Sequence, residues 1–122
     1  MESQIDAKTA SKIEARRTLL QQEVERYVQI LKEKEQPDKV ILFGSLATGN
    51  VHEWSDIDLV VIKPTGLPFL KRTRALRKTI DPQVALEILC YTPEEFAQLC
   101  TERRFFRDEI LSKGKVLYDR TS

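Results

Sequence analysis

Apolar residues recur at steps of three and four between Ser11 and Glu35, a spacing that places them on one face of a helix. The residues of this face are Leu20, Val24, Tyr27, Val28 and Leu31. Gln36-Pro37-Asp38 ends the pattern, because proline cannot donate the backbone hydrogen bond that a helix interior requires. The pattern predicts a long first helix that packs on a sheet; an outer face that docks a partner is the alternative. The polar residues 1–10 are expected to fray.

Short apolar runs predict the strands. Val40–Phe43 stops at a glycine, and Ile57–Ile62 is rich in β-branched residues. Val84–Tyr91 is a third run, and Val116–Tyr118 is a short fourth one. The stretches between the runs read as helices over residues 67–80, 93–101 and 105–112. These elements predict an α/β fold, in which helices pack on a small, mixed, twisted sheet of about four strands.

Length and composition narrow the class of protein. A chain of 122 residues predicts a single domain over residues 1–122. The net charge of +1 argues against stable nucleic-acid binding, for which a strongly basic face is expected. No apolar run approaches membrane-spanning length and no signal peptide opens the chain, so a cytoplasmic protein without a membrane partner is expected. Cys90 and Cys100 form no metal pattern and are interpreted as core thiols.

Asp56 and Asp58 begin the second strand run. Side chains alternate along a strand, so these two carboxylates point to one side and Ile57 points to the other. Two close like charges repel each other. A cation relieves that repulsion, and oxygen ligands suit a hard ion such as Mg²⁺. The pair is therefore a candidate metal site.

Gly44 and Ser45 follow the first strand and open a short predicted helix through Ala47. Glycine lets a ligand approach the backbone closely, and free N–H groups at a helix start favour an anion. The Ser45 hydroxyl can contact the ligand, or it can cap the turn. This turn is a candidate phosphate site.

Glu87 interrupts the apolar run of the third strand. An unpaired carboxylate buried among apolar residues would be costly, so the charge implies a partner such as a shared metal. Asp81 is the rival third carboxylate, but it precedes a proline in a turn. Glu87 is the better candidate of the two.

Gly44-Ser45, ten intervening residues and Asp56-Ile57-Asp58 resemble the signature of the minimal nucleotidyltransferase (MNT) family of the DNA polymerase β-like superfamily. The resemblance implies a nucleotidyltransferase that uses ATP as substrate and Mg²⁺ or Mn²⁺ as cofactor. It implies nucleotide binding at Gly44 and Ser45, and metal binding and catalysis by Asp56, Asp58 and Glu87. The family's third carboxylate is usually aspartate, and a basic residue often stands where this chain has Thr48.

Short members of this family resemble the antitoxins of HEPN/MNT toxin–antitoxin pairs, which silence HEPN ribonuclease toxins by adding AMP to a toxin tyrosine. The expected function is therefore AMP transfer to a hydroxyl, most simply a tyrosine, of a HEPN partner protein, because the chain leaves little room for its own acceptor domain. An antitoxin that acts by binding alone and a small-molecule nucleotidyltransferase are the alternatives.

Three features of the sequence allow more than one interpretation. His52 lacks a second ligand nearby and is interpreted as a surface loop residue rather than a zinc ligand. Trp54 either shelters the site, stacks on a base or anchors its loop on the core. The basic residues between Lys71 and Lys78 form either a solvated helix face or a contact for phosphates or an acidic partner.

Overall fold

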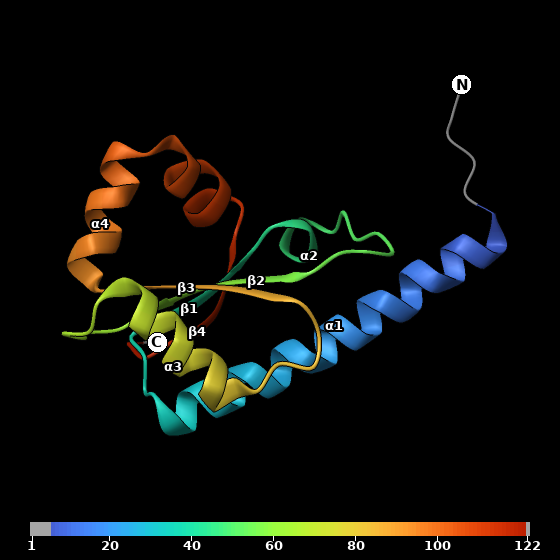
Figure 1. The fold of residues 1–122 in the computed structure, drawn as a ribbon. Helices are drawn as coiled ribbons and strands as arrows, with labels where there is room; N and C mark the ends of the chain where they lie inside the picture. The colour runs from blue at the N-terminus through green and yellow to red at the C-terminus, as the bar shows by residue number, and fades with distance from the viewer. Residues whose placement is uncertain (1–5, 122) are drawn as a thin grey trace.

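The computed structural model describes residues 6–121 of the chain. Its centre is a four-stranded sheet with the strand order β3-β2-β1-β4 (Figure 1). The strands are β1 (Lys39–Phe43), β2 (Ile57–Ile62), β3 (Leu86–Tyr91) and β4 (Lys115–Asp119). The helices are α1 (Ala7–Lys34), α2 (Ser45–Thr48), α3 (Phe69–Ile80), α4 (Pro93–Glu102) and the π-helix η1 (Phe106–Ser112). The predicted α/β class with a small mixed sheet is confirmed.

Strand pairing brings three distant segments to one end of the sheet. β1 runs antiparallel to both β2 and β4, whereas β2 and β3 are parallel and are connected through α3. In this register Asp58 lies opposite Phe43 on one side and opposite Glu87 on the other. The end of β1 therefore lies beside the beginnings of β2 and β3.

The sheet is covered on both faces (Figure 1). One buried cluster joins α1 and α3 to alternate strand residues, among them Leu42, Leu59 and Ile88. A second cluster joins α4 and η1 to the intervening positions Ile41, Phe43, Val60 and Ile62. Because both faces are packed, the strands are apolar at nearly every position, as the sequence pattern indicated.

The first helix starts earlier than the pattern predicted. Asp6 caps it, since one Asp6 carboxylate oxygen accepts a hydrogen bond from the Thr9 amide at 2.7 Å. Fraying was expected over residues 1–10, and this expectation is wrong for residues 7–10, which are helical; residues 1–5 lie outside the described part. Among the described helices, none is long and apolar enough to cross a membrane.

The remaining boundaries agree closely with the pattern, with two differences. Val84 and Ala85 precede β3 instead of belonging to it, and residues 106–112 form a π-helix. Thr92 and Glu95 make a reciprocal capping box at the start of α4. Cys90 is buried and Cys100 is half-buried, and both are free thiols.

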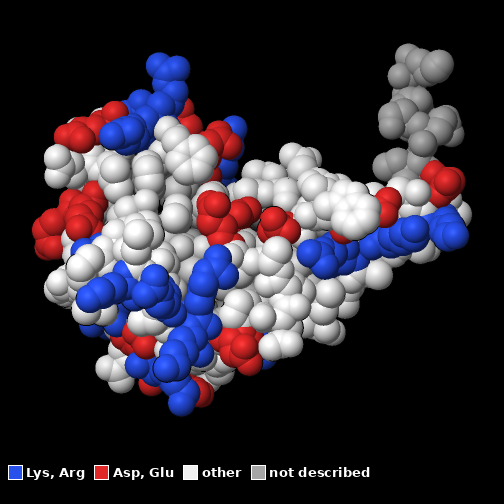
Figure 2. All heavy atoms as spheres, viewed as in Figure 1, with Lys and Arg blue, Asp and Glu red and all other residues white. Residues whose placement is uncertain are grey.

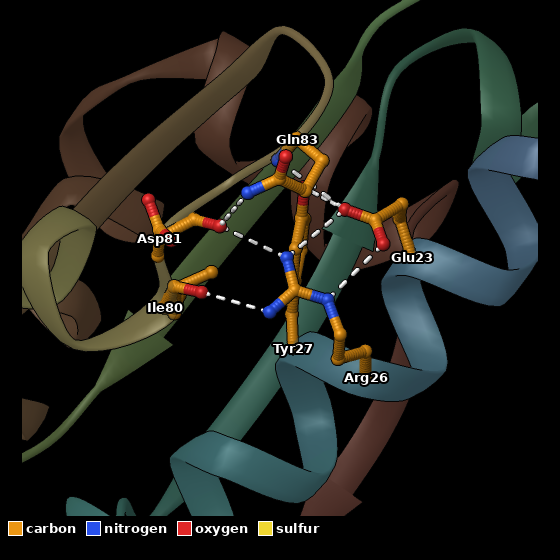
Figure 3. Close-up of polar contacts among 6 residues, drawn as sticks. All are labelled: Glu23, Arg26, Tyr27, Ile80, Asp81 and Gln83. Carbon is orange, nitrogen blue, oxygen red and sulfur yellow. Dashed lines mark hydrogen bonds and ion pairs between the residues drawn. The ribbon is translucent and has the colours of Figure 1, made fainter.

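A polar network ties α1 to the segment that leads into β3 (Figure 3). Arg26 donates hydrogen bonds to the carbonyls of Ile80 and Asp81, each at 3.0 Å, and to the carboxylate of Glu23. The same carboxylate accepts hydrogen bonds from the Tyr27 hydroxyl at 3.0 Å and, at 3.3 Å, from the Gln83 amide. The network thereby fixes the connection between α3 and β3, and Glu87 lies in that strand.

Replacing Arg26 by alanine should lower the free energy of unfolding by about 1–3 kcal/mol, because the Glu23 charge loses its cation and the Ile80 carbonyl loses its side-chain donor. Arg17→Ala is the matched control: Arg17 is on the same helix but makes only a surface ion pair with Glu14 at 3.5 Å, worth at most about 1 kcal/mol. Urea unfolding measures both values. Equal losses in the two variants would contradict the structural role of the network.

Candidate functional site: a carboxylate cluster beside a glycine turn

Three carboxylates gather where β2 and β3 begin. Asp58 and Glu87 are the second residues of their strands and lie opposite each other in the parallel register, so they project on one face. Asp56 precedes Asp58 by two residues and is exposed. Asp58 is half-buried, and both other carboxylates raise its pKa. The structure thus brings together all three side chains that the sequence nominated.

Glu87 is in a different environment from the one predicted. It is exposed, whereas its neighbours Leu86 and Ile88 point into the other face and are buried. On the side that Glu87 faces, Leu89 and Tyr91 pack under α4 and η1, and Glu87 lies beyond that cover. The prediction that Glu87 is buried and needs a partner for its charge is therefore wrong. Other carboxylates do lie near that charge.

The electrostatics of the cluster favour a cation. Burial is the main reason that the pKa of Asp58 rises to about 6, and the charges of Glu87 and Asp56 raise it further. Within residues 6–121, no three His, Cys, Asp or Glu side chains are grouped closely enough to hold a metal ion by themselves. Mg²⁺ normally takes one or two carboxylates together with substrate phosphates, so the donor chemistry of this cluster fits it.

Gly44 follows β1 directly and packs closely against the Asp58 side chain. Its φ is +76°, in the region that residues with a side chain rarely adopt, and a Cβ atom at this position would run into Oδ2 of Asp58. Glycine is therefore required both by the turn and by the approach of the carboxylate. The Gly44 carbonyl accepts hydrogen bonds from the amides of Ala47 and Thr48 at 3.1 and 3.2 Å. Amides earlier in such a turn have no carbonyl partner within the helix.

Ser45 is the first residue of α2 and does not cap it; Gly44 occupies the cap position. The Ser45 hydroxyl donates a hydrogen bond to the hydroxyl of Ser55 at 3.1 Å. Ser55 is only 2% exposed, and its hydroxyl also accepts a hydrogen bond from the His52 amide at 2.8 Å. Ser55 thus joins the glycine turn to the loop before Asp56. In the sequence, the only signal for this role is that Ser55 stands next to the aspartates.

The loop between α2 and β2 carries two residues that the sequence left open. His52 is exposed, and its Nδ1 accepts a hydrogen bond from the Trp54 amide at 3.2 Å, in agreement with a surface loop role. Trp54 is 79% exposed, so it does not anchor the loop on the core.

The basic residues of α3 divide into two groups. Arg72 pairs with Glu95 at 2.6 Å, and Arg77 donates to the carbonyl of Leu86, so these two have structural partners. Lys71, Arg74 and Lys78 are exposed. Asp81, the rival third carboxylate, ends α3 in a left-handed conformation.

Deprotonation of Asp58 should make the metal-free protein less stable. The folded state keeps this proton up to about pH 6, because burial and the two neighbouring carboxylates raise the pKa of Asp58 from its ordinary value of 3.8 to about 6. The folded state therefore binds more protons between these two values, and the free energy of unfolding falls as the pH rises through this window. Asp58→Asn should melt above the wild type at pH 7.5 in EDTA, and this advantage should shrink at pH 4. Melting curves test it, with Asp81→Asn as control; an advantage independent of pH would contradict the prediction.

Comparison with known proteins agrees with this geometry. The family model described as "Polymerase beta, Nucleotidyltransferase" matches residues 25–122. The chain belongs to this nucleotidyltransferase family. The matched region contains the glycine turn and the side chains of Asp56, Asp58 and Glu87. A search of curated proteins finds no match.

Two solved structures are similar to this polymerase β-type domain. One is a crystal structure of a protein from Sulfolobus solfataricus provisionally assigned as a nucleotidyltransferase, with a TM-score of 0.65 and 12% identity over 91% of this chain and 90% of that one. This likeness supports the fold. The other is a crystal structure of a toxin–antitoxin with AMP-PNP, with a TM-score of 0.47 and 20% identity over 78% of this chain and 72% of that one. A TM-score below 0.5 indicates neither a common function nor a common partner.

Proposed function

We propose that this protein transfers AMP from ATP, with Mg²⁺ or Mn²⁺ as cofactor, to a hydroxyl of a partner protein. The proposed acceptor is a tyrosine, and the proposed partner is a HEPN ribonuclease toxin that the protein restrains as an antitoxin. The observation that carries the reaction type is the arrangement around Asp58, with Gly44 on one side and Glu87 on the other. The MNT-like spacing from Gly44-Ser45 to Asp56 and Asp58 supports the choice of partner.

The strand order suits an in-line reaction. Gly44 follows β1, and Asp58 and Glu87 are the second residues of β2 and β3, so the glycine turn and Glu87 lie on opposite sides of Asp58. A triphosphate held at Gly44 and Ser45 leaves the Glu87 side open to an acceptor hydroxyl. Attack along the line joining the two sides displaces pyrophosphate away from the acceptor.

Each residue then has one task. Gly44 and Ser45 bind the triphosphate, and Asp56 and Asp58 hold the metal with Glu87 beside them. Bound Mg²⁺ would supply neutralisation of the phosphate charge that develops during transfer. Glu87 accepts the proton of the acceptor hydroxyl while the oxygen of that hydroxyl forms a bond to the α-phosphorus. The bond from the α-phosphorus to the bridging oxygen breaks, and the electron pair leaves with pyrophosphate.

The exposure of Asp56 and Glu87 supports a macromolecular acceptor. A tyrosine is a long side chain whose hydroxyl reaches into a site open to solvent, while the rest of the partner stays outside. The cytoplasm, where ATP and Mg²⁺ are available, is the proposed compartment.

Binding without chemistry is the second candidate. Two observations favour it: Glu87 stands where the resembling family usually has aspartate, and no described trio of ligands is preformed for a metal. In that case the partner would be inhibited but not modified.

The test is to incubate the protein with the product of its neighbouring gene, ATP and Mg²⁺, and to measure the intact mass of that partner. A mass increase of one or more AMP groups that disappears with Asp56→Asn and Asp58→Asn supports transfer. An unmodified but inhibited partner overturns the enzymatic proposal in favour of binding. Modification that survives both substitutions but not Glu87→Gln overturns the metal assignment.

A further inference from the structure

A hollow of about 420 Å³ opens between the first half of α1 and the loop before β2. Its lining residues are Lys12, Ala15, Arg16, Leu19, Glu53 and Trp54. We propose that this hollow binds the distal phosphates of the nucleoside triphosphate, with Lys12 and Arg16 as the cations. The proposal rests on the proposed function and adds residues of α1, outside the signature motif, to the nucleotide site.

Hydrogen bonds place this hollow next to the glycine turn. Arg16 Nε donates to the Ser55 carbonyl at 3.0 Å, and the Ser45 hydroxyl donates to the Ser55 hydroxyl at 3.1 Å. Arg16 and Ser45 therefore hold the same buried residue from two sides. Asp56 follows Ser55 directly, so a triphosphate that starts at the carboxylates and crosses Ser45 continues toward α1.

The charges of Lys12 and Arg16 are available to a ligand. In the part of the chain that the structure describes, neither side chain forms an ion pair, whereas Arg26 pairs with Glu23 and Arg72 pairs with Glu95. Arg16 donates to Ser55 through Nε alone, so among residues 6–121 its two terminal nitrogens have no acceptor and can bind phosphate oxygens. Figure 2 shows basic groups along the first half of α1, beside acidic groups in the middle of this face.

The known parts of the phosphate turn do not supply this charge. The turn helix α2 is only 4 residues long, and Thr48 stands where the resembling family often has a basic residue. A triphosphate carries more negative charge than one Mg²⁺ neutralises. Cations from α1 would balance the remainder.

Trp54 and Glu53 make the hollow testable. Trp54 is the single tryptophan of the chain and is 79% exposed, so its fluorescence reports on a ligand in the hollow. Glu53 lines the same hollow and repels phosphate. Removing its charge should therefore act in the opposite direction from removing Lys12 or Arg16.

The experiment titrates the full chain with Mg·ATP, AMP or inorganic tripolyphosphate, using calorimetry for Kd and Trp54 emission for location. Lys12→Gln and Arg16→Gln should each raise the Kd of ATP and tripolyphosphate roughly tenfold and leave that of AMP unchanged, as expected for a charged hydrogen bond lost from the distal phosphates. Glu53→Gln should lower the Kd of ATP. The control is Arg17→Gln, on the same helix but outside the hollow. It should leave the Kd of ATP, tripolyphosphate and AMP unchanged.

Lys12 keeps the test valid if Arg16→Gln disturbs the loop, since the Lys12 side chain is exposed and makes no hydrogen bond within residues 6–121 that its loss could break. ATP affinity unchanged in both variants overturns the inference, while AMP transfer by the wild type leaves the proposed function standing. An equal rise in the Kd of AMP also overturns it, because the hollow would then hold the nucleoside. A wild type that neither binds ATP nor transfers AMP overturns both proposals.

Discussion

Asp58→Asn is expected to reduce AMP transfer by roughly a thousandfold, since bound metal contributes several kcal/mol to stabilising the charge of the transition state. Asp58 is central to the cluster: it is half-buried, lies opposite Glu87 and is approached by Gly44. Asparagine keeps the shape of the side chain but not its charge. The overall fold should survive, and the metal-free protein should become more stable at neutral pH because like-charge repulsion is relieved.

Single-turnover transfer from labelled ATP to the partner measures this effect, and calorimetry measures the nucleotide-dependent binding of Mg²⁺. Asp81→Asn is the matched control, because Asp81 also precedes β3 but ends α3 in a left-handed conformation that asparagine tolerates. The control should keep the wild-type rate. Unchanged nucleotide-dependent metal affinity in Asp58→Asn would refute the assignment of Asp58 as a ligand.

Gly44→Ala has the second large expected effect, a loss of both nucleotide binding and stability. The new Cβ would collide with Oδ2 of Asp58, and the backbone at φ +76° is strained for any residue with a side chain. Strain of this kind alone costs about 1–3 kcal/mol. Gly44→Val should be more severe, and in both variants the first obstacle is the carboxylate of Asp58 rather than the incoming triphosphate.

Gly49→Ala separates strain from collision. Gly49 has φ +86°, but nothing lies within 4 Å of a Cβ placed there, so this variant should suffer only the backbone cost and still bind ATP. Urea unfolding measures the loss of stability, and calorimetry measures the affinity for ATP. In the double variant Gly44→Ala/Asp58→Ala the colliding oxygen is gone, and its loss of stability should be smaller than the sum of the single losses. Additive losses would show that the collision is not the cause.

Elements whose formation depends on local pattern could be predicted from the sequence. The three-and-four spacing that forms α1 and the apolar runs that form β1 and β2 each depend on residues only a few positions apart in the chain. The boundaries that differed from the prediction depend on single contacts, such as the hydrogen bond from the Thr9 amide to Asp6 that caps α1.

For the candidate site, local sequence pattern was enough to nominate the residues: a glycine-serine turn, two aspartates on one strand face and a glutamate in a later strand. How these residues meet depends on the tertiary structure. The register of β2 on β3 sets Glu87 beside Asp58, and the end of β1 brings Gly44 against the same carboxylate. The exposure of Glu87 and the approach of Arg16 to Ser55 also depend on segments far apart in the chain. Periodicity and residue identity act over a few residues, whereas register, burial and charge proximity arise only when distant segments pack together.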